Sequence, residues 1–244
     1  MIEYNIEIAG SVAGIRAQFK TTRRYCRGYR TEKEAIFSVE CTPDDIAFER
    51  EKQRREYQLE GLPEEEFPDH LLERTAVQRK LAEQLFDHDV LVFHGSVVAV
   101  DGQAYLFTAK SGTGKSTHTR FWRETFGDRA VMVNDDKPFL RMTEDGVLVY
   151  GSPWNGKHRL GNNICLPLKA ICILERGEEN QIQAISGQEA SPMLFQQSNR
   201  PMNPRKMLTY MDLIDKLSKN TSFYRMQCNL DPDAARVAYE KMSK

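Results

Sequence analysis

The sequence has no long apolar run and almost no net charge, and each absence excludes a class of protein. No stretch approaches the ~20 apolar residues that a membrane-spanning helix needs. No basic segment precedes an apolar run at the start, so we expect neither membrane insertion nor secretion. The net charge is −1 over 244 residues, which argues against a general binder of polyanions such as nucleic acid.

Paired cysteines and metal-ligand spacings are also missing. The five cysteines are odd in number and show no C-x-x-C spacing, so we expect them to be reduced thiols or packing residues, which suits a cytoplasmic protein. The histidines show no ligand spacing with cysteine, which argues against a structural zinc site. The sequence contains no internal repeat and no low-complexity tract.

The chain is long enough for a small domain joined to a larger one. Residues 1–70 are expected to form a β-rich N-terminal region, because short runs there alternate apolar and polar side chains, as in half-exposed antiparallel strands. The acidic stretch from Asp44 to Asp69 is expected to contain a loop. Residues 71–244 are expected to form an α/β nucleotide-binding domain with a mixed sheet. That domain should begin with a helix whose apolar residues from Leu71 to Phe86 recur near a 3.6-residue period.

Basic side chains are frequent between Arg16 and Lys33, where they alternate with aromatic residues. Such a segment could bind a phosphorylated ligand or nucleic acid. A solvated strand edge explains the same composition, because positive charge there discourages edge-to-edge pairing. We favour the strand edge.

The most informative stretch is AKSGTGKST, Ala109 to Thr117, which follows the apolar run AYLFT and opens an amphipathic segment. It matches the phosphate-binding (Walker A) pattern G-x-x-x-x-G-K-[ST] except that Ala109 replaces the first glycine, a cost if that position needs positive φ. Successive backbone N–H groups and the following helix N-terminus would bind an anion there. The predicted nucleotide-binding residues are Ser111, Gly112, Thr113, Gly114, Lys115, Ser116 and Thr117. Lys115 would reach the β- and γ-phosphates and Ser116 would ligate Mg²⁺.

The strand before this loop is predicted to be the second strand of a hairpin. Asp101-Gly102 separates VLVFHGSVVAV from QAYLFTA, and this dipeptide favours a two-residue turn with both residues at positive φ. Two helices are predicted to close the chain: Arg205 to Lys219, with Met207, Met211, Ile214 and Leu217 on one stripe, and another after Asp231-Pro232.

Two adjacent acids end a later apolar strand, AVMVN, at Asp135 and Asp136. Adjacent residues of a strand point to opposite faces, so Asp135 could serve Mg²⁺ while Asp136 faces the acceptor of a phosphoryl group. An Asp-Asp turn that caps the next segment is the alternative.

Two further features carry candidate catalytic side chains. His94, before Gly95 at the end of VLVF, could be either a core histidine or a functional one. The segment Gly151 to Asn163 places Lys157, His158 and Arg159 on a glycine-containing loop, where cations could spread the charge of a transferring phosphoryl group. We expect Trp154 to be exposed in this loop, which favours a binding role over a plain surface loop.

The order of these parts along the chain resembles that of the HPr kinase/phosphorylase family and, more distantly, of ATP-dependent phosphoenolpyruvate carboxykinase. The parts are His94-Gly95, the apolar hairpin, the SGTGKS loop that ends at Ser116, and Asp135-Asp136. The resemblance covers about Val90 to Leu140. It implies a P-loop core of that type, ATP (or another nucleoside triphosphate) and Mg²⁺ as cofactors, and self-association into a homo-oligomer. It also implies that Asp136 is the acid/base residue, Asp135 the metal-side carboxylate and His94 a neighbour of the transferred phosphate.

The match is incomplete after the Asp-Asp pair. HPr kinases carry a glutamate in an E-x-R-G-L-G type segment, whereas this chain has Lys157-His158-Arg159-Leu160-Gly161. The resemblance therefore does not extend to a second metal ligand or to a reverse phosphorylase activity. The opening region also differs from the N-terminal domain of the full-length enzymes, so recognition of HPr itself is not implied.

The leading hypothesis is an ATP- and Mg²⁺-dependent kinase that phosphorylates a hydroxyl, with serine of a peptide or protein favoured over a small molecule. Asp136, His94, Lys115, Lys157 and Arg159 are its predicted catalytic residues. The alternative is a non-catalytic nucleotide sensor of the same fold. Carboxykinase activity is disfavoured because those enzymes are far longer, and nucleic-acid binding through Arg16 to Lys33 is a minor hypothesis.

Overall fold

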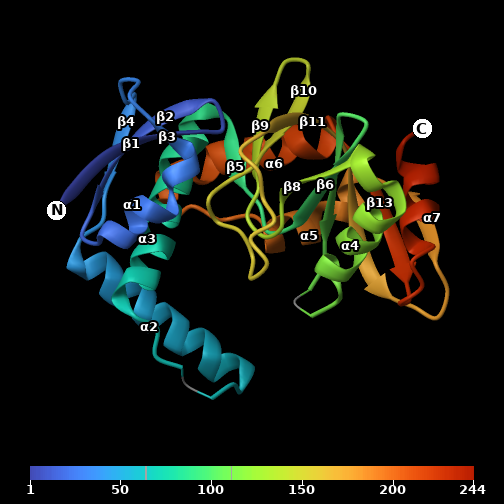
Figure 1. The fold of residues 1–244 in the computed structure, drawn as a ribbon, viewed down its shortest axis with the longest axis horizontal. Helices are drawn as coiled ribbons and strands as arrows, with labels where there is room; N and C mark the ends of the chain where they lie inside the picture. The colour runs from blue at the N-terminus through green and yellow to red at the C-terminus, as the bar shows by residue number, and fades with distance from the viewer. Residues whose placement is uncertain (64, 111) are drawn as a thin grey trace. The chain divides into compact units, whose positions relative to one another are not determined.

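The computed structural model describes residues 1–63, 65–110 and 112–244 (Figure 1). These residues form two compact units, Met1–Gln84 and Leu85–Lys244. The helix that the sequence predicts from Leu71 is α3, Asp69–Leu85, and nearly all of it belongs to the first unit. No helix of the described chain is long and apolar enough to cross a membrane.

The first unit combines a small sheet with helices. Strands β1 (Ile2–Ile8) and β2 (Ser11–Ala17) pair antiparallel, as the alternating sequence predicts. Strand β4 (Phe37–Glu40) differs from the expectation because it pairs parallel with β2, and β3 (Arg30–Thr31) pairs with β1. The basic segment contains α1 (Lys20–Tyr25), and Arg16 at its start forms ion pairs with Glu3 and Glu40.

The acidic stretch contains a helix that the sequence analysis missed, α2 (Pro43–Glu60), in addition to the expected loop. The Thr42 side chain accepts from the backbone N–H of Asp45, whose carboxylate accepts from the backbone N–H of Thr42, so the two form a capping box. Pro43 occupies the first turn, and Gly61 ends the helix at φ 66°. These capping signals are present in the sequence and would have predicted the helix.

The second unit is built on a mixed sheet, so the expected α/β class is confirmed. Its strand order is β5-β9-β10-β11-β7-β6-β8, with β13 beside β11 and β12 beside β13. The strands are β5 (Val90–Val92), β6 (Ser96–Val100), β7 (Gln103–Thr108), β8 (Ala130–Asn134), β9 (Phe139–Thr143), β10 (Gly146–Tyr150), β11 (Cys165–Arg176), β12 (Gln181–Ile185) and β13 (Ser222–Cys228). Strands β7, β11 and β13 are parallel, and β6 pairs antiparallel with both β7 and β8. The carboxyl ends of β7, β8, β11 and β13 therefore meet at one edge.

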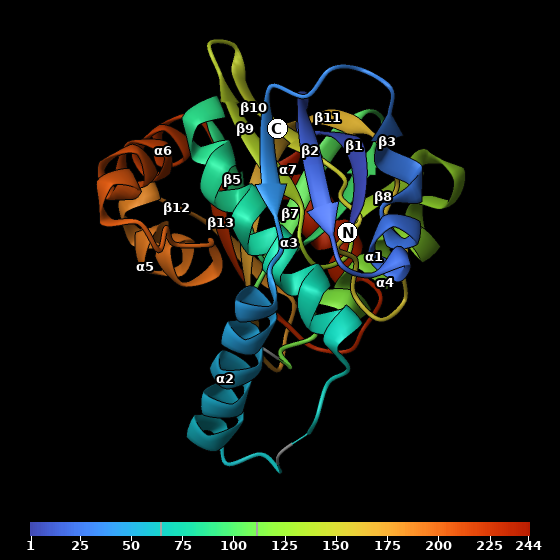
Figure 2. The same ribbon diagram turned by 90° about the vertical axis from the view of Figure 1, so that its left-hand side faces the viewer.

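Helices cover both faces of this sheet. One hydrophobic cluster joins the strands to α5 (Gly187–Gln197) and α6 (Met207–Lys219), and another joins them to α4 (Lys115–Phe126) and α7 (Ala234–Met242). Figure 2 shows α5 and α6 on one side of the strands and α4 on the other. The predicted closing helices are confirmed, but the buried stripe of α6 is Tyr210, Leu213, Ile214 and Leu217, whereas Met207 and Met211 are exposed.

The hairpin that leads to the predicted phosphate loop forms as expected from the sequence. Strands β6 and β7 pair from Ser96–Phe107 to Val100–Gln103, and the connecting Asp101 and Gly102 have φ values of 52° and 79°. Both central residues thus adopt the positive φ of a type I′ turn.

A histidine is part of the apolar layer between α4 and the sheet. His118 is 3% exposed, its ring lies 4.5 Å from that of Phe107, and its Nε2 accepts a hydrogen bond of 3.1 Å from the indole N–H of Trp122. Burial lowers the pKa of His118 to about 3. A neutral ring is required here because a buried imidazolium would lose its hydration.

Replacement of His118 by glutamine should therefore flatten the pH dependence of stability. When the pKa of a histidine falls from 6.5 to about 3 on folding, the unfolded chain binds a proton below pH 6.5 that the folded chain does not bind, so the free energy of unfolding decreases as the pH falls. Between pH 7 and pH 5 the free energy of unfolding of the wild type should fall by about 2 kcal/mol more than that of His118→Gln. Urea denaturation at both pH values measures this difference, and equal losses in the two proteins would contradict it.

Candidate functional site

The predicted phosphate loop connects the carboxyl end of β7 to the start of α4. Gly112 and Gly114 have φ values of 75° and 118°, and a Cβ added at either would meet no atom within 4 Å. The positive φ, and not a lack of space, is thus what favours glycine at both positions. Ala109 is not among the residues with positive φ, so alanine at the first position of the pattern carries no such strain.

Two interactions connect the loop to the first turn of α4. The Lys115 ammonium donates to the carbonyl of Ala109 over 3.2 Å, and the His118 N–H donates to the carbonyl of Gly114 over 2.9 Å. Ser116 is exposed and Thr117 half-buried on the same turn. Ser111 lies outside the described residues, so its predicted role stays a prediction.

The Asp135-Asp136 pair follows β8 in a bend and not within the strand, which corrects the predicted alternation of faces. Buried Asn134 makes the bend: its Oδ1 accepts from the N–H groups of Asp136 and Lys137 over 2.8 and 2.6 Å. The two carboxylates still diverge. Asp135 accepts from the Gly156 N–H over 2.8 Å, whereas Asp136 lies beside the Lys137 ammonium at 3.0 Å.

His94 lies next to this bend because the chain around it is hydrogen-bonded to residues 136–138. The N–H groups of Phe93 and Gly95 donate to the carbonyls of Pro138 and Asp136, each over 3.0 Å. The His94 Nε2 consequently lies 3.4 Å from Asp136 Oδ1. Gly95 permits this approach, since an added Cβ would lie 2.9 Å from Leu106.

Charges within this cluster influence one another. Partial burial, followed by the positive charges of Lys137 and Lys115, lowers the pKa of His94 to about 4, while Asp136 acts in the opposite direction. Burial and the Lys137 charge also lower the pKa of Lys115, again opposed by Asp136. The structure thus brings His94, Lys115 and Asp136, three of the predicted catalytic residues, into one electrostatic cluster together with Lys137.

The loop from Gly151 to Ile164 is anchored to β8 and to the bend. The Asn162 N–H donates to the carbonyl of Val133 over 3.1 Å, and an added Cβ on Gly151 would collide with the Asn162 carbonyl. Lys157, His158 and Arg159 are exposed, and Arg159 has a φ of 50°, which is uncommon for a residue with a side chain. Their predicted contact with a phosphoryl group stays a prediction.

The expectation of an exposed tryptophan in this loop is wrong. Trp154 is 6% exposed, and its ring centroid lies 6.1 Å from that of Phe139. Its carbonyl accepts from the Lys137 N–H over 3.2 Å, so it helps to fix the bend after Asp136. Burial in the core explains this tryptophan without any binding partner.

Sequence reasoning missed the residues that position the cluster. Besides Asn134 and Lys137, Ser152 is buried, and its hydroxyl donates to the Lys137 carbonyl over 2.7 Å and accepts from Asn134 Nδ2 over 3.1 Å. Gln197, at the end of α5, accepts from the His94 N–H through its carbonyl over 2.6 Å. A polar residue that ends an apolar strand directly before Asp-Asp is a signal for Asn134, whereas Ser152 and Gln197 are distant in sequence and carry no comparable signal.

The described residues contain no group of three or more His, Cys, Asp or Glu side chains arranged to hold a metal ion. All five cysteines are described, and none of them forms a disulfide in the structure.

No known family model and no curated protein matches the chain. Among solved structures, it is similar to the Hpr(Ser) kinase/phosphatase from Coxiella burnetii, with 10% identity and a TM-score of 0.36 over 63% of this chain and 99% of that chain. Membership of the HPr kinase family stays a prediction. We draw the proposal below from the residues of the site and not from this similarity.

Asn134→Ala tests what holds the bend. The change leaves the Asp136 N–H without its side-chain acceptor, and the Lys137 N–H keeps only the Trp154 carbonyl. An unpaired group costs about 1–3 kcal/mol when it is shielded from water. We expect the free energy of unfolding to fall by at least that amount in urea denaturation. Asn220→Ala, at an exposed helix end, is the matched control and should cost well under that. Equal effects of the two changes would contradict this account of the bend.

Lys137→Gln tests the coupling of charges. Removal of the Lys137 charge should raise the pKa of His94 from about 4 toward 6.5, because that charge opposes protonation of the ring. Nitrogen NMR shifts of the imidazole, followed against pH, measure the change. Lys241→Gln, at an exposed position of α7, should leave the titration of His94 unaltered. An unchanged His94 pKa in Lys137→Gln would show that the lysine does not act on the ring.

Proposed function

We propose that the chain is an ATP- and Mg²⁺-dependent kinase that transfers the γ-phosphoryl group to a hydroxyl, with serine of a peptide or protein as the acceptor. The observation that carries the proposal is the cluster of His94, Lys115, Asp136 and Lys137 beside a glycine-containing loop at the start of α4. A loop of this kind offers backbone N–H groups to an anion, and a carboxylate beside two ammonium groups suits the transfer of an anionic group.

The roles follow from charge and position. Lys115, in the first turn of α4, would neutralise the β- and γ-phosphates. Asp136 would accept the proton of the attacking hydroxyl while a new bond forms between the acceptor oxygen and the γ-phosphorus. The bond from that phosphorus to the bridging oxygen breaks at the same time, and ADP leaves. Lys137, 3.0 Å from Asp136, and the exposed Lys157 and Arg159 would stabilise the negative charge of the transferring group.

His94 would act as a neutral side chain. Its pKa of about 4 keeps the imidazole uncharged near pH 7, so its Nε2–H can donate to Asp136, 3.4 Å away, or to a phosphoryl oxygen. A neutral ring orients Asp136 without adding a further positive charge to the pair of lysines.

The donor set fits Mg²⁺. The cation usually takes one or two protein oxygens and completes its shell with phosphate and water. Ser116 and Asp135 offer a hydroxyl and a carboxylate near the phosphate loop and the bend, and Asp135 Oδ1 is already held by the Gly156 N–H. Bound Mg²⁺ would neutralise phosphate charge.

A non-catalytic nucleotide sensor is the second candidate. The observation that favours it is the composition of the loop after Gly156, where Lys157, His158 and Arg159 are exposed and no carboxylate joins Asp135 and Asp136. Under either function we propose a cytoplasmic protein that acts without nucleic acid or a membrane. Self-association into a homo-oligomer is a further part of the proposal.

Lys115→Ala and Asp136→Asn test the proposal because the first should weaken nucleotide binding, whereas the second should slow phosphoryl transfer alone. Asp136→Asn keeps the shape of the side chain but not the base, so MgATP should still bind while transfer falls by about 10²- to 10⁴-fold. Lys115→Ala should weaken MgATP binding and lower transfer by roughly 100-fold. Calorimetry measures binding, and transfer of labelled γ-phosphate to a serine-containing peptide library measures activity.

Lys241→Ala and Asp128→Asn, at exposed positions outside the cluster, are the matched controls and should behave as the wild type. Transfer at the wild-type rate by Asp136→Asn would show that Asp136 is not the base. Tight binding of MgATP by the wild type with no transfer to any peptide would favour the sensor.

A further inference from the structure

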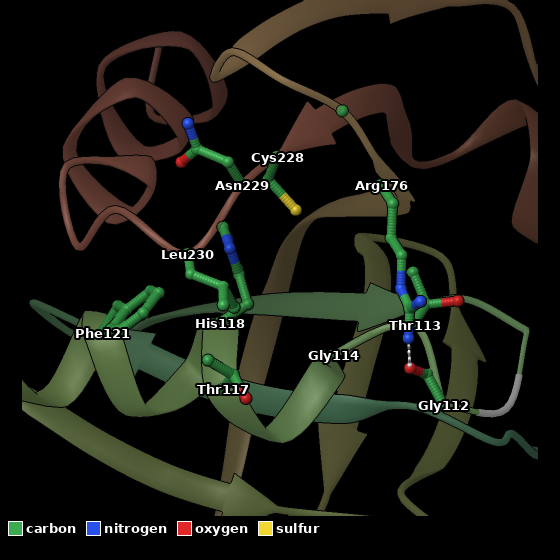
Figure 3. A pocket seen from close by; sticks show the side chains of 11 residues that line it. Gly112, Thr113, Gly114, Thr117, His118, Phe121, Arg176, Cys228, Asn229 and Leu230 are labelled. Carbon is green, nitrogen blue, oxygen red and sulfur yellow. Dashed lines mark hydrogen bonds between the residues drawn. The ribbon is translucent and has the colours of Figure 1, made fainter.

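A cavity of about 560 Å³ lies on the other side of the phosphate loop from the Asp136 cluster. Its lining combines the loop with α4 and with the segments that follow β11 and β13; it includes Gly112, Thr113, His118, Arg176, Cys228 and Leu230. Figure 3 shows His118, Leu230 and Cys228 grouped together, whereas Arg176 extends to Gly112. The volume falls within the range of ~300–1,000 Å³ that small-molecule sites occupy.

The strand order explains why the loop has different surroundings on its two sides. Strand β7 lies between β11, which leads with β13 to the cavity, and β6, which leads to β8 and the Asp135-Asp136 bend. A molecule with its phosphates on the loop would therefore have the charged cluster on one side and the cavity on the other. A nucleoside triphosphate has the matching asymmetry, because its γ-phosphate and its base lie at opposite ends.

Apolar groups dominate the cavity wall away from the phosphate loop. Phe121 contributes one side, and Leu230, with 82% of its surface exposed, contributes the rim. The segment that carries Leu230 is held in place by the preceding residue, Asn229. The Asn229 N–H donates to Asn180 Oδ1 over 3.1 Å, and its Nδ2 donates to the Glu178 carbonyl over 2.7 Å. A flat aromatic base is the kind of group that such walls cover.

His118 supplies a hydrogen-bond donor to this wall. Because its Nε2 accepts a hydrogen bond from the Trp122 indole, the proton of the imidazole is on Nδ1. None of the described residues accepts a hydrogen bond from this Nδ1–H, although the side chain is 3% exposed and lines the cavity. A donor on a residue that lines a cavity can bind an acceptor there, and a base or ribose offers several.

Arg176 joins the cavity to the phosphate loop. Its Nη2 donates to the Gly112 carbonyl over 2.7 Å, so its guanidinium lies where the nucleoside would meet the first phosphate. Guanidinium groups bind phosphate oxygens through several N–H donors at once.

We propose that this cavity holds the base and ribose of the nucleoside triphosphate, with the His118 Nδ1–H donating to the nucleoside and Arg176 beside the α-phosphate. The inference rests on the proposed function, since it assumes that the loop binds a polyphosphate. The inference identifies the part of the site that makes the protein bind a nucleoside triphosphate more tightly than an inorganic polyphosphate.

Calorimetry with MgATP and with inorganic tripolyphosphate tests this assignment. The wild type should bind ATP on the order of 10- to 100-fold more tightly than tripolyphosphate, which is what stacking and covering one base contributes. Leu230→Ala removes an exposed wall and should reduce the preference for ATP several-fold without affecting tripolyphosphate. Leu208→Ala, at a similarly exposed leucine (78%) on α6, is the matched control and should change neither affinity.

Cys228→Phe provides the stronger test, because its larger side chain fills the cavity. It should lower the affinity for ATP to that for tripolyphosphate, whereas Cys165→Phe, at the exposed start of β11, should not. Equal affinities of the wild type for the two ligands, or an unchanged ratio in both Leu230→Ala and Cys228→Phe, would overturn the inference and leave the kinase proposal standing. Failure of both ligands to bind the wild type would overturn the two together.

Discussion

The site depends on the hydrogen bonds of one buried amide, that of Asn134. Its Oδ1 accepts from the N–H groups of Asp136 and Lys137, and its Nδ2 donates to Ser152, so a single side chain connects the end of β8 with the loop that follows β10. The bend it makes sends Asp135 toward Gly156 and Asp136 toward His94. If β8 continued through Asp135 and Asp136, their backbone groups would pair with a neighbouring strand. The two carboxylates could then not both lie at the sheet edge where the predicted phosphate loop begins.

The balance of charge in the cluster favours a bound anion. The positive charges of Lys115 and Lys137 lower the pKa of His94, and that of Lys137 also lowers the pKa of Lys115. Asp136 offsets only part of this repulsion. A polyphosphate beside them would remove the repulsion, whereas a cation would add to it. The depressed pKa of His94 belongs to the same balance, because a third positive charge there would have to be accommodated in a partly buried space. The site is thus arranged for negative charge before any ligand arrives.

Local patterns allowed the glycine-containing turn before α4 and the β6–β7 hairpin to be predicted, since each depends on residues adjacent in sequence. Gly112 and Gly114 have the positive φ that the pattern requires, and Asp101-Gly102 forms the turn that its composition indicates. Trp154 shows where such reasoning fails: its loop is polar, yet the ring packs on Phe139, which only the tertiary fold brings there. Ser152 and Gln197 were missed for the same reason, as their partners lie far away in sequence.

One helix connects the two halves of the proposed nucleotide site. Lys115 in the first turn of α4 belongs to the charged cluster, while His118, one turn later, lines the cavity. A leucine or phenylalanine at 118 would pack between Phe107 and Trp122 without the cost of keeping a titratable group neutral and buried. The Nε2 of His118 accepts the hydrogen bond of the Trp122 indole N–H, but this interaction does not use the second ring nitrogen, Nδ1, and its proton. Packing does not explain the Nδ1–H group, whereas a ligand in the cavity that accepts a hydrogen bond from it would explain why position 118 is a histidine.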